Sequence, residues 1–123
     1  MKKILITGGA GFIPSSLADA LLATGKYFVV AVDNFLTGKE EHIASNTHYR
    51  FIKGDVNDCT LLSSIMLQYD FDYVFHYAAV VGVIRTTDNP NLVLDDIKGL
   101  QHIFDLSKKT KVKRIFFSSS SEV

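Results

Sequence analysis

Short apolar runs alternate along the chain with segments whose apolar residues recur every three or four positions. The runs are typical of buried strands, and the spaced segments are typical of helices with one apolar face. We predict strands at Lys3–Thr7, Tyr27–Asp33, Tyr49–Lys53, Tyr73–Tyr77 and Val112–Phe117. We predict helices at Phe12 to about Thr24, at Thr60–Gln68 with Asp58 as N-cap, and from Asn89-Pro90 to about Lys109, with one helical turn around Glu40–Ala44.

The first and last helices each carry a set of apolar residues at helical spacing, which we expect to face the core. In the first helix these are Ile13, Leu17, Ala20, Leu21 and Ala23. In the last helix they are Val93, Ile97, Leu100, Ile103 and Phe104.

Strands and helices that alternate in this way predict an α/β fold with a parallel sheet and helices on both of its faces. We expect a Rossmann-type doubly wound sheet of about five strands, in the order 3-2-1-4-5. In such sheets ligands bind at the carboxyl ends of the strands, near the switch between strands 1 and 4. Residues 1–123 would form one such domain.

Composition narrows the class of protein. The 123 residues are 47% hydrophobic, and their 13 basic and 13 acidic residues cancel, so nothing global indicates a nucleic-acid partner. The single cysteine, Cys59, excludes a disulfide framework within the chain, and the histidines show no metal-ligand spacing, so we expect no metal. No apolar run approaches the roughly 20 residues of a membrane helix. We therefore expect a cytoplasmic protein with no membrane partner.

A glycine-rich turn joins the first strand to the first helix. Gly8 would let the chain turn sharply, and Gly11 would leave room where the backbone approaches a pyrophosphate. The amides of the first helical turn, at Phe12 and Ile13, would then face the phosphates. The alternative is an ordinary tight connection between a strand and a helix.

An acidic residue, Asp33, closes the second strand about 20 residues after Gly11. A carboxylate there accepts hydrogen bonds from the adenosine ribose hydroxyls and repels a 2′-phosphate. We therefore expect the cofactor to be NAD rather than NADP. The alternative for Asp33 is a turn residue before Asn34.

Six motifs then resemble one family: LITGGAGFI, VDNF, GDVND, FHYAAVVGV, NPNLVLDDIKGL and FFSSSSEV. The chain is similar to the N-terminal half of the extended short-chain dehydrogenase/reductases, the NAD-dependent nucleotide-sugar epimerase/dehydratase family. The resemblance implies that Asp55 binds the adenine amino group, with Val56 beside it. It implies further cofactor contacts at Asn34, Tyr77, Ala78, Ala79 and Ser118. We expect His76, at the end of the fourth strand, to make one local hydrogen bond.

The last motif implies two catalytic residues. In the family, the residue matched by Ser120 hydrogen-bonds the sugar 4-hydroxyl while a tyrosine removes the proton and the C4 hydride passes to NAD. Glu122 resembles the pattern of 4,6-dehydratases and uronate decarboxylases, in which a carboxyl group acts at C5 of the 4-keto intermediate. The motif does not favour dehydratase or decarboxylase chemistry over epimerase chemistry. The alternative for Glu122 is a solvated charge at the end of a strand.

Four features depart from the family pattern. Pro14 stands in place of its third glycine, Asp96 in place of an asparagine and Leu100 in place of a threonine. The family's Tyr-x-x-x-Lys pair is matched only by Tyr49–Lys53, in a predicted strand, where the two side chains lie about 13 Å apart. The catalytic tyrosine, its lysine and the substrate domain would therefore be absent, and we expect no turnover by these residues alone.

The resemblance thus implies the NAD-binding portion of an enzyme that acts on a UDP- or dTDP-linked sugar. It also implies a homodimer, in which helix Asn91–Lys109 contributes to the interface as well as to the core. The alternative is a stand-alone, non-catalytic nucleotide-binding or interaction module. Such a module would need a partner to cover its exposed sheet and helix faces.

Overall fold

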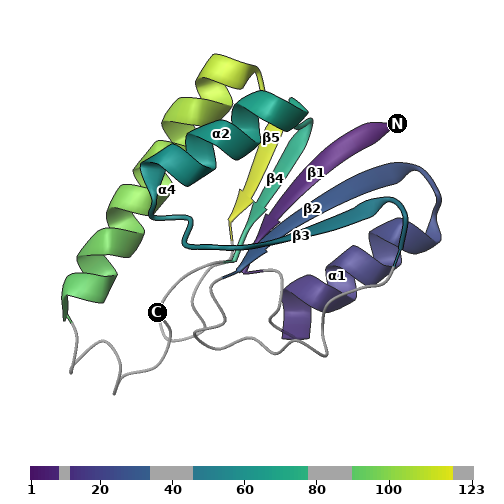
Figure 1. The fold of residues 1–123 in the computed structure, drawn as a ribbon, viewed down its shortest axis with the longest axis horizontal. Helices are drawn as coiled ribbons and strands as arrows, with labels where there is room; N and C mark the ends of the chain where they lie inside the picture. Colours follow the sequence, from purple (N-terminus) through teal and green to yellow (C-terminus); the bar gives the residue numbers. More distant parts are fainter. Residues whose placement is uncertain (9–11, 34–45, 78–89, 118–123) are drawn as a thin grey trace.

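The chain folds into a parallel five-stranded sheet with the order β3-β2-β1-β4-β5, as seen in a computed structural model (Figure 1). The structure describes residues 1–8, 12–33, 46–77 and 90–117, with the side chains of 90–97 outside the description. Strand order and parallel pairing agree with the order predicted from the sequence. The predicted helical turn at Glu40–Ala44 lies outside the described residues.

The described elements follow one another as alternating strands and helices. The strands are β1 at Lys2–Thr7, β2 at Tyr27–Asp33, β3 at Tyr49–Lys53, β4 at Tyr73–His76 and β5 at Arg114–Phe117. The helices are α1 at Phe12–Ala23, α2 at Cys59–Tyr69 and α4 at Pro90–Thr110. None of these described helices is long and apolar enough to cross a membrane.

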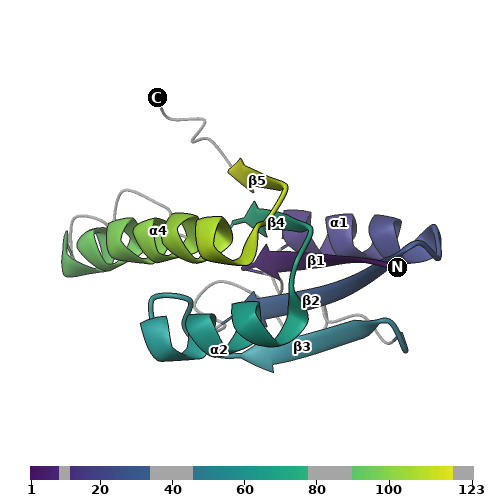
Figure 2. The ribbon, with the colours of Figure 1, turned by 90° about the horizontal axis from the view of Figure 1, so that it is seen from above.

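Helices cover both faces of the sheet, so the predicted doubly wound arrangement is confirmed. Figures 1 and 2 show α2 and α4 on one face and α1 on the other. Because side chains alternate along a strand, each buried strand feeds two cores. Leu5 and Val30 pack with α2 and α4, whereas Ile4 and Val29 pack against α1.

Several predicted element ends were wrong by one or two residues. The fifth strand begins at Arg114 rather than at Val112, because the Val112 amide donates to the carbonyl of Ser107 at the end of α4 and Lys111 adopts a left-handed backbone with φ 61°. The N-cap prediction is confirmed: the Asp58 carboxylate accepts hydrogen bonds from the amides of Thr60 and Leu61.

The predicted core faces of two helices need correction. In α1 the buried residues are Pro14, Ser15 and Ala18, while Ile13 is 64% exposed. Small side chains let the helix lie close to the sheet, and the larger apolar residues lie at its flanks. In α4 Ile103 is fully buried, but Phe104 is 48% exposed and does not belong to the core.

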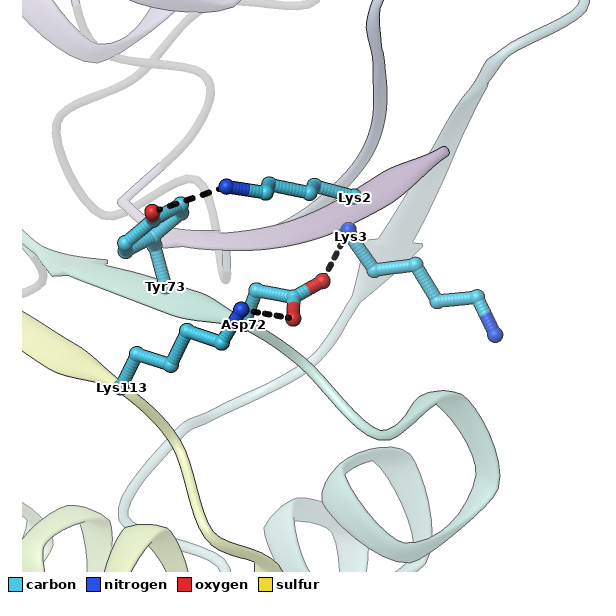
Figure 3. Close-up of polar contacts among 5 residues, drawn as sticks. All are labelled: Lys2, Lys3, Asp72, Tyr73 and Lys113. Carbon is cyan, nitrogen blue, oxygen red and sulfur yellow. Dashed lines mark hydrogen bonds and ion pairs between the residues drawn. The ribbon is translucent and has the colours of Figure 1, made fainter.

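At the amino ends of the strands, one carboxylate joins three strands (Figure 3). Asp72, which precedes β4, accepts a 2.9 Å hydrogen bond from the backbone amide of Lys3 through Oδ2. Its backbone amide donates to the carbonyl of Lys3, and its carbonyl accepts from the amide of Lys113 before β5. The ammonium group of Lys113 lies 3.7 Å from Oδ1 of the same carboxylate. Asp72 therefore fixes the starts of β1, β4 and β5 relative to one another.

Replacing Asp72 should destabilise the sheet mainly through the lost bond to the backbone. We expect Asp72→Ala to lower the free energy of unfolding by about 1–2 kcal/mol, since the carboxylate is partly screened by solvent. The control Lys113→Ala removes only an exposed ion pair and should cost less than about 0.5 kcal/mol. Urea denaturation measures both, and equal losses in the two variants would contradict this assignment.

A buried phenol lies between the sheet and α1. Tyr49 begins β3, is 5% exposed, and its hydroxyl has no hydrogen-bond partner among the described residues. Burial raises the pKa of this hydroxyl from 10.0 to about 12, and the negative charges of Asp19 and Asp33 add to the increase. The unfolded chain thus loses this proton near pH 10, whereas the folded chain keeps it up to about pH 12.

Tyr49→Phe should therefore change how stability depends on alkaline pH. In the wild type, ionisation of Tyr49 in the unfolded chain lowers the free energy of unfolding as the pH rises from 10 to about 12. The variant cannot ionise at this position, so its free energy of unfolding should exceed that of the wild type by a growing amount across that range. Near pH 7 it should be equally stable or more stable by up to about 1 kcal/mol. The free energy of unfolding of both proteins is measured by urea denaturation at several pH values between 10 and about 12. A difference between the two proteins that stays constant over this range would refute the prediction.

Candidate functional site

Four strands end at one edge of the sheet and are tied together there by backbone hydrogen bonds. The Gly8 amide donates to the carbonyl of Val32 at 2.7 Å, which joins the exit of β1 to β2. The Gly54 amide donates to the carbonyl of Asp33 at 3.0 Å, which joins the exit of β3 to β2. The Tyr77 amide donates to the carbonyl of Thr7, which joins β4 to β1. The candidate residues that follow these strands therefore share one rigid edge.

The turn after β1 has the backbone expected of a glycine turn. Gly8 has φ 71°, in the left-handed region that disfavours other residues. The helix α1 begins at Phe12, so its positive end lies on the same side of the sheet as this turn. Its first turn carries no acidic side chain. An anion at this helix end would meet backbone amides and no acidic side chain from that first turn.

Pro14 changes the number of donors available in that turn. It is buried in the third position of α1 and has no amide hydrogen. Because the amides of a first helical turn have no acceptor inside the helix, the proline does not weaken the helix itself. It leaves Phe12 and Ile13 as the donors that precede it in α1.

Asp33 closes β2 with its side chain almost enclosed. The residue is 8% exposed, and its backbone carbonyl receives the Gly54 amide. The carboxylate lies on the α1 face, since Asp33 alternates with Ala31 and Val29 of that core. Its charge reaches the neighbouring Tyr49, where it helps raise the pKa of the phenol.

A second carboxylate stands on the turn between β3 and α2. Asp55 is exposed, and its Oδ1 accepts a 2.9 Å hydrogen bond from the amide of Asn57. The Asp58 amide donates to the Asp55 carbonyl, also at 2.9 Å, which closes the turn. Val56 points into the core beneath α2 and α4 and is 5% exposed. The turn therefore directs the Asp55 carboxylate outward, while the next residue, Val56, packs the turn against the core.

Thr7 and His76 form a buried polar pair that joins β1 to β4. Thr7 Oγ1 lies 2.8 Å from Nδ1 of His76 and accepts the Tyr77 amide at 3.0 Å. Both side chains are buried, and the His76 ring stacks on Phe117 of β5 with 6.2 Å between ring centroids. The structure thus gives His76 a hydrogen-bond partner on the neighbouring strand β1. Thr7 was not among the predicted site residues, although it is the threonine of the motif LITGGAGFI.

The structure thus brings together part of the predicted site. Gly8, Asp33, Asp55 and Tyr77 follow or end neighbouring strands at this edge, and Phe12 and Ile13 open α1 with exposed side chains. The remaining predicted residues lie outside the described ones: Gly11, Asn34, Ala78, Ala79, Ser118, Ser120 and Glu122.

The one Tyr-x-x-x-Lys match lies in a strand, as predicted. Tyr49 opens β3 and is buried, whereas Lys53 ends it and is exposed. Side chains at the two ends of a strand of this length cannot share a proton or a ligand. This pair therefore does not form the tyrosine base and lysine of the family motif.

The described residues fit a dinucleotide. Gly8 has the left-handed backbone of a glycine turn, and the first turn of α1 carries no acidic side chain, which suits a pyrophosphate. Two carboxylates follow the next two strands outward from β1, which suits the hydroxyl and amino donors of an adenosine. The switch in strand order between β1 and β4 lies beside them, where such sheets bind their ligands.

Comparison with known proteins finds related sequences and structures. The profile of the NAD dependent epimerase/dehydratase family matches residues 4–123. A putative UDP-glucose 4-epimerase of Methanocaldococcus jannaschii is 35% identical over 118 residues, which are 95% of this chain and 37% of that protein. A UDP-N-acetyl-alpha-D-glucosaminuronate decarboxylase of Bacillus cytotoxicus is 37% identical over 124 residues, 99% of this chain and 37% of that protein.

Solved structures of UDP-glucose 4-epimerases have the same fold as this chain. A UDP-glucose 4-epimerase of Thermotoga maritima with UDP-glucose superposes with a TM-score of 0.88 at 35% identity, over 96% of this chain and 38% of that one. A UDP-glucose 4-epimerase of Thermus thermophilus in complex with NAD gives 0.86 at 28% identity, over 96% and 37%. The chain therefore spans about 37% of the length of the curated relatives described above.

The Thr7–His76 pair makes a testable contribution to this edge. Thr7→Val keeps the shape of the side chain but removes the hydroxyl, so we expect a loss of about 1–3 kcal/mol in the free energy of unfolding. Thr7→Ser keeps the hydroxyl and loses one methyl group, which should cost about 1 kcal/mol. Chemical denaturation compares them, and a valine variant at least as stable as the serine variant would argue against this role for the hydroxyl.

Proposed function

This chain belongs to the NAD dependent epimerase/dehydratase family, and from that premise we propose that it is the NAD-binding portion of a nucleotide-sugar enzyme. The enzyme would act through transient oxidation at C4 of the sugar. Membership confirms the family resemblance that the sequence motifs indicated. Because the chain spans about 37% of its relatives' length, the activity of the whole enzyme is part of the proposal.

One observation carries the cofactor assignment. The glycine turn after β1 and the carboxylate that ends β2 lie on adjacent strands, joined by the hydrogen bond from Gly8 to Val32. We assign the pyrophosphate to the turn and to the first amides of α1, at Phe12 and Ile13. The ribose hydroxyls of the adenosine would donate to Asp33. A 2′-phosphate would meet the same negative charge, which favours NAD over NADP.

The adenine end of the cofactor would lie over the next strand. Its amino group would donate to Oδ2 of Asp55, since Oδ1 already accepts the amide of Asn57. Val56 would adjoin the adenine through its backbone, since its side chain packs in the core. Gly11, Asn34, Tyr77, Ala78, Ala79 and Ser118 complete the proposed contacts.

The sugar chemistry is assigned from the sequence motif at the end of the chain. When bound, NAD supplies the acceptor for the C4 hydride. Ser120 would hold the sugar 4-hydroxyl by a hydrogen bond, and Glu122 would act at C5 if the enzyme is a dehydratase or decarboxylase. The general base would come from outside these 123 residues, since Tyr49 and Lys53 lie on β3.

Relatives that are a putative UDP-glucose 4-epimerase and a UDP-N-acetyl-alpha-D-glucosaminuronate decarboxylase support a nucleotide sugar as the substrate class. They include an epimerase and a decarboxylase, so epimerase and decarboxylase or dehydratase chemistry stand as alternatives. We favour a UDP-linked sugar, with a dTDP-linked sugar as the second choice. A homodimer and a cytoplasmic location belong to the same proposal.

A second candidate function is a nucleotide-binding or interaction module without catalysis. It is favoured by apolar surface on the α1 face of the sheet, where Tyr73, Phe75 and Phe116 line a hollow beside α1. Phe116 and Phe117 on β5 are 42% and 57% exposed. A pure interaction module need not bind NAD, which separates the two functions.

Titration with NAD tests the proposal. The chain should bind one NAD, and Asp33→Asn should weaken binding by at least about tenfold, because a charged acceptor of two hydroxyls is lost. The same variant should narrow the preference for NAD over NADP. Isothermal titration calorimetry measures both affinities.

The matched control is Asp70→Asn, which makes the same substitution at the exposed C-cap of α2. Asparagine tolerates the left-handed backbone of that position, so the fold should be kept. Asp70→Asn should bind NAD like the wild type. Absence of NAD binding in the wild type, or equal affinities in the wild type and Asp33→Asn, would refute the cofactor assignment.

A further inference from the structure

The interior of α4 holds a glycine at a buried position, Gly99. Glycine disfavours a helix interior because its backbone has the most freedom to lose. Its presence well inside a helix of 21 residues therefore points to a neighbour that needs the space. That neighbour is the turn between β3 and α2.

A side chain at Gly99 would collide with Asn57. A Cβ placed on Gly99 overlaps Oδ1 of Asn57 and lies 3.0 Å from its Cγ and 3.5 Å from its Cα. Asn57 is half-buried, and rotating its terminal amide alone would move Oδ1 but leave the added Cβ close to Cγ and Cα. The turn can lie this close to α4 because residue 99 has no side chain.

Asn57 in turn holds the Asp55 carboxylate. Its backbone amide donates to Asp55 Oδ1 at 2.9 Å, and the next residue, Asp58, donates to the Asp55 carbonyl. Val56, between them, packs in the core that includes Ile103 of α4. The turn is thus fixed to α4 through two adjacent residues, and a shift of Asn57 moves the group that orients Asp55.

We propose that Gly99 is a positioning residue for the adenine end of the cofactor site. Because Gly99 has no side chain, Asn57 can lie against α4. The amide of Asn57 then holds the Asp55 carboxylate where the adenine amino group can donate to it. This inference rests on the proposed binding of NAD. It goes beyond that proposal by naming a residue of α4 that determines where the Asp55 carboxylate lies.

The test compares NAD with nicotinamide hypoxanthine dinucleotide, which carries an oxygen in place of the adenine amino group. The wild-type chain should bind NAD about tenfold more tightly than this analogue, because the analogue lacks the amino donor and turns an acceptor oxygen toward the Asp55 carboxylate. Gly99→Ala should reduce that ratio to less than about threefold. The ratio reports the contact with the amino group, so a general loss of stability does not change it.

Two further variants separate a steric cause from other effects of the substitution. In an Asn57→Ala background the colliding Oδ1 and Cγ are gone, so adding Gly99→Ala should change NAD affinity by less than about twofold. Gln101→Ala, at an exposed position of the same helix, should leave the ratio at its wild-type value. Circular dichroism checks that each variant is folded. If Gly99→Ala does not fold, Asn57→Gln, which is one methylene longer over the same glycine, should lower the ratio in its place.

The outcomes distinguish the two proposals. A Gly99→Ala chain that keeps the wild-type ratio overturns this inference and leaves NAD binding in place. A wild-type chain that binds both dinucleotides equally also overturns it, since Asp55 then has no contact to be positioned for. A wild-type chain that binds neither overturns the proposed function and this inference together.

Discussion

The hydrogen bonds that join β1, β2, β3 and β4 at their carboxyl ends are the constraint on which the candidate site depends. They extend the pairing of the strands by one residue, through Gly8, Gly54 and Tyr77. Each of these residues begins the connection that carries, or leads to, a candidate cofactor contact. Because the strands are parallel, the connections after them begin at one edge of the sheet.

The helical layer formed by α2 and α4 supports that edge from behind. Val56 enters the core shared with Leu62 and Ile103, so the turn that presents Asp55 is part of the packing of the domain. Two glycines let the layers approach closely there. A Cβ at Gly54 would meet Leu61 of α2, and a Cβ at Gly99 would meet Asn57. The geometry of an exposed carboxylate thus follows from contacts that are mostly buried.

Apolar runs and helical spacing predicted the strands and all the described helices, because they report which face of each element is buried. The strand order followed from the alternation of strands with helices and the order usual for dinucleotide-binding sheets. It failed where tertiary contacts override local pattern. The exposure of Phe104 and the burial of Ser15 depend on how closely each helix approaches the sheet, which periodicity does not record. The partner of His76 could not be predicted either, since Thr7 lies 69 residues away in the chain. Gly99 did leave a signal, as a glycine inside a predicted helix.

The central claim is that a dinucleotide binds at the carboxyl edge of this sheet. The most direct measurement is an amide ¹H–¹⁵N correlation spectrum of the chain with and without NAD. The account predicts shifts concentrated at Gly8, Ile13, Asp33 and Asp55, with Lys3, Asp72 and Lys113 at the opposite edge unchanged. Shifts centred on those three residues, or no shifts at saturating NAD, would contradict it.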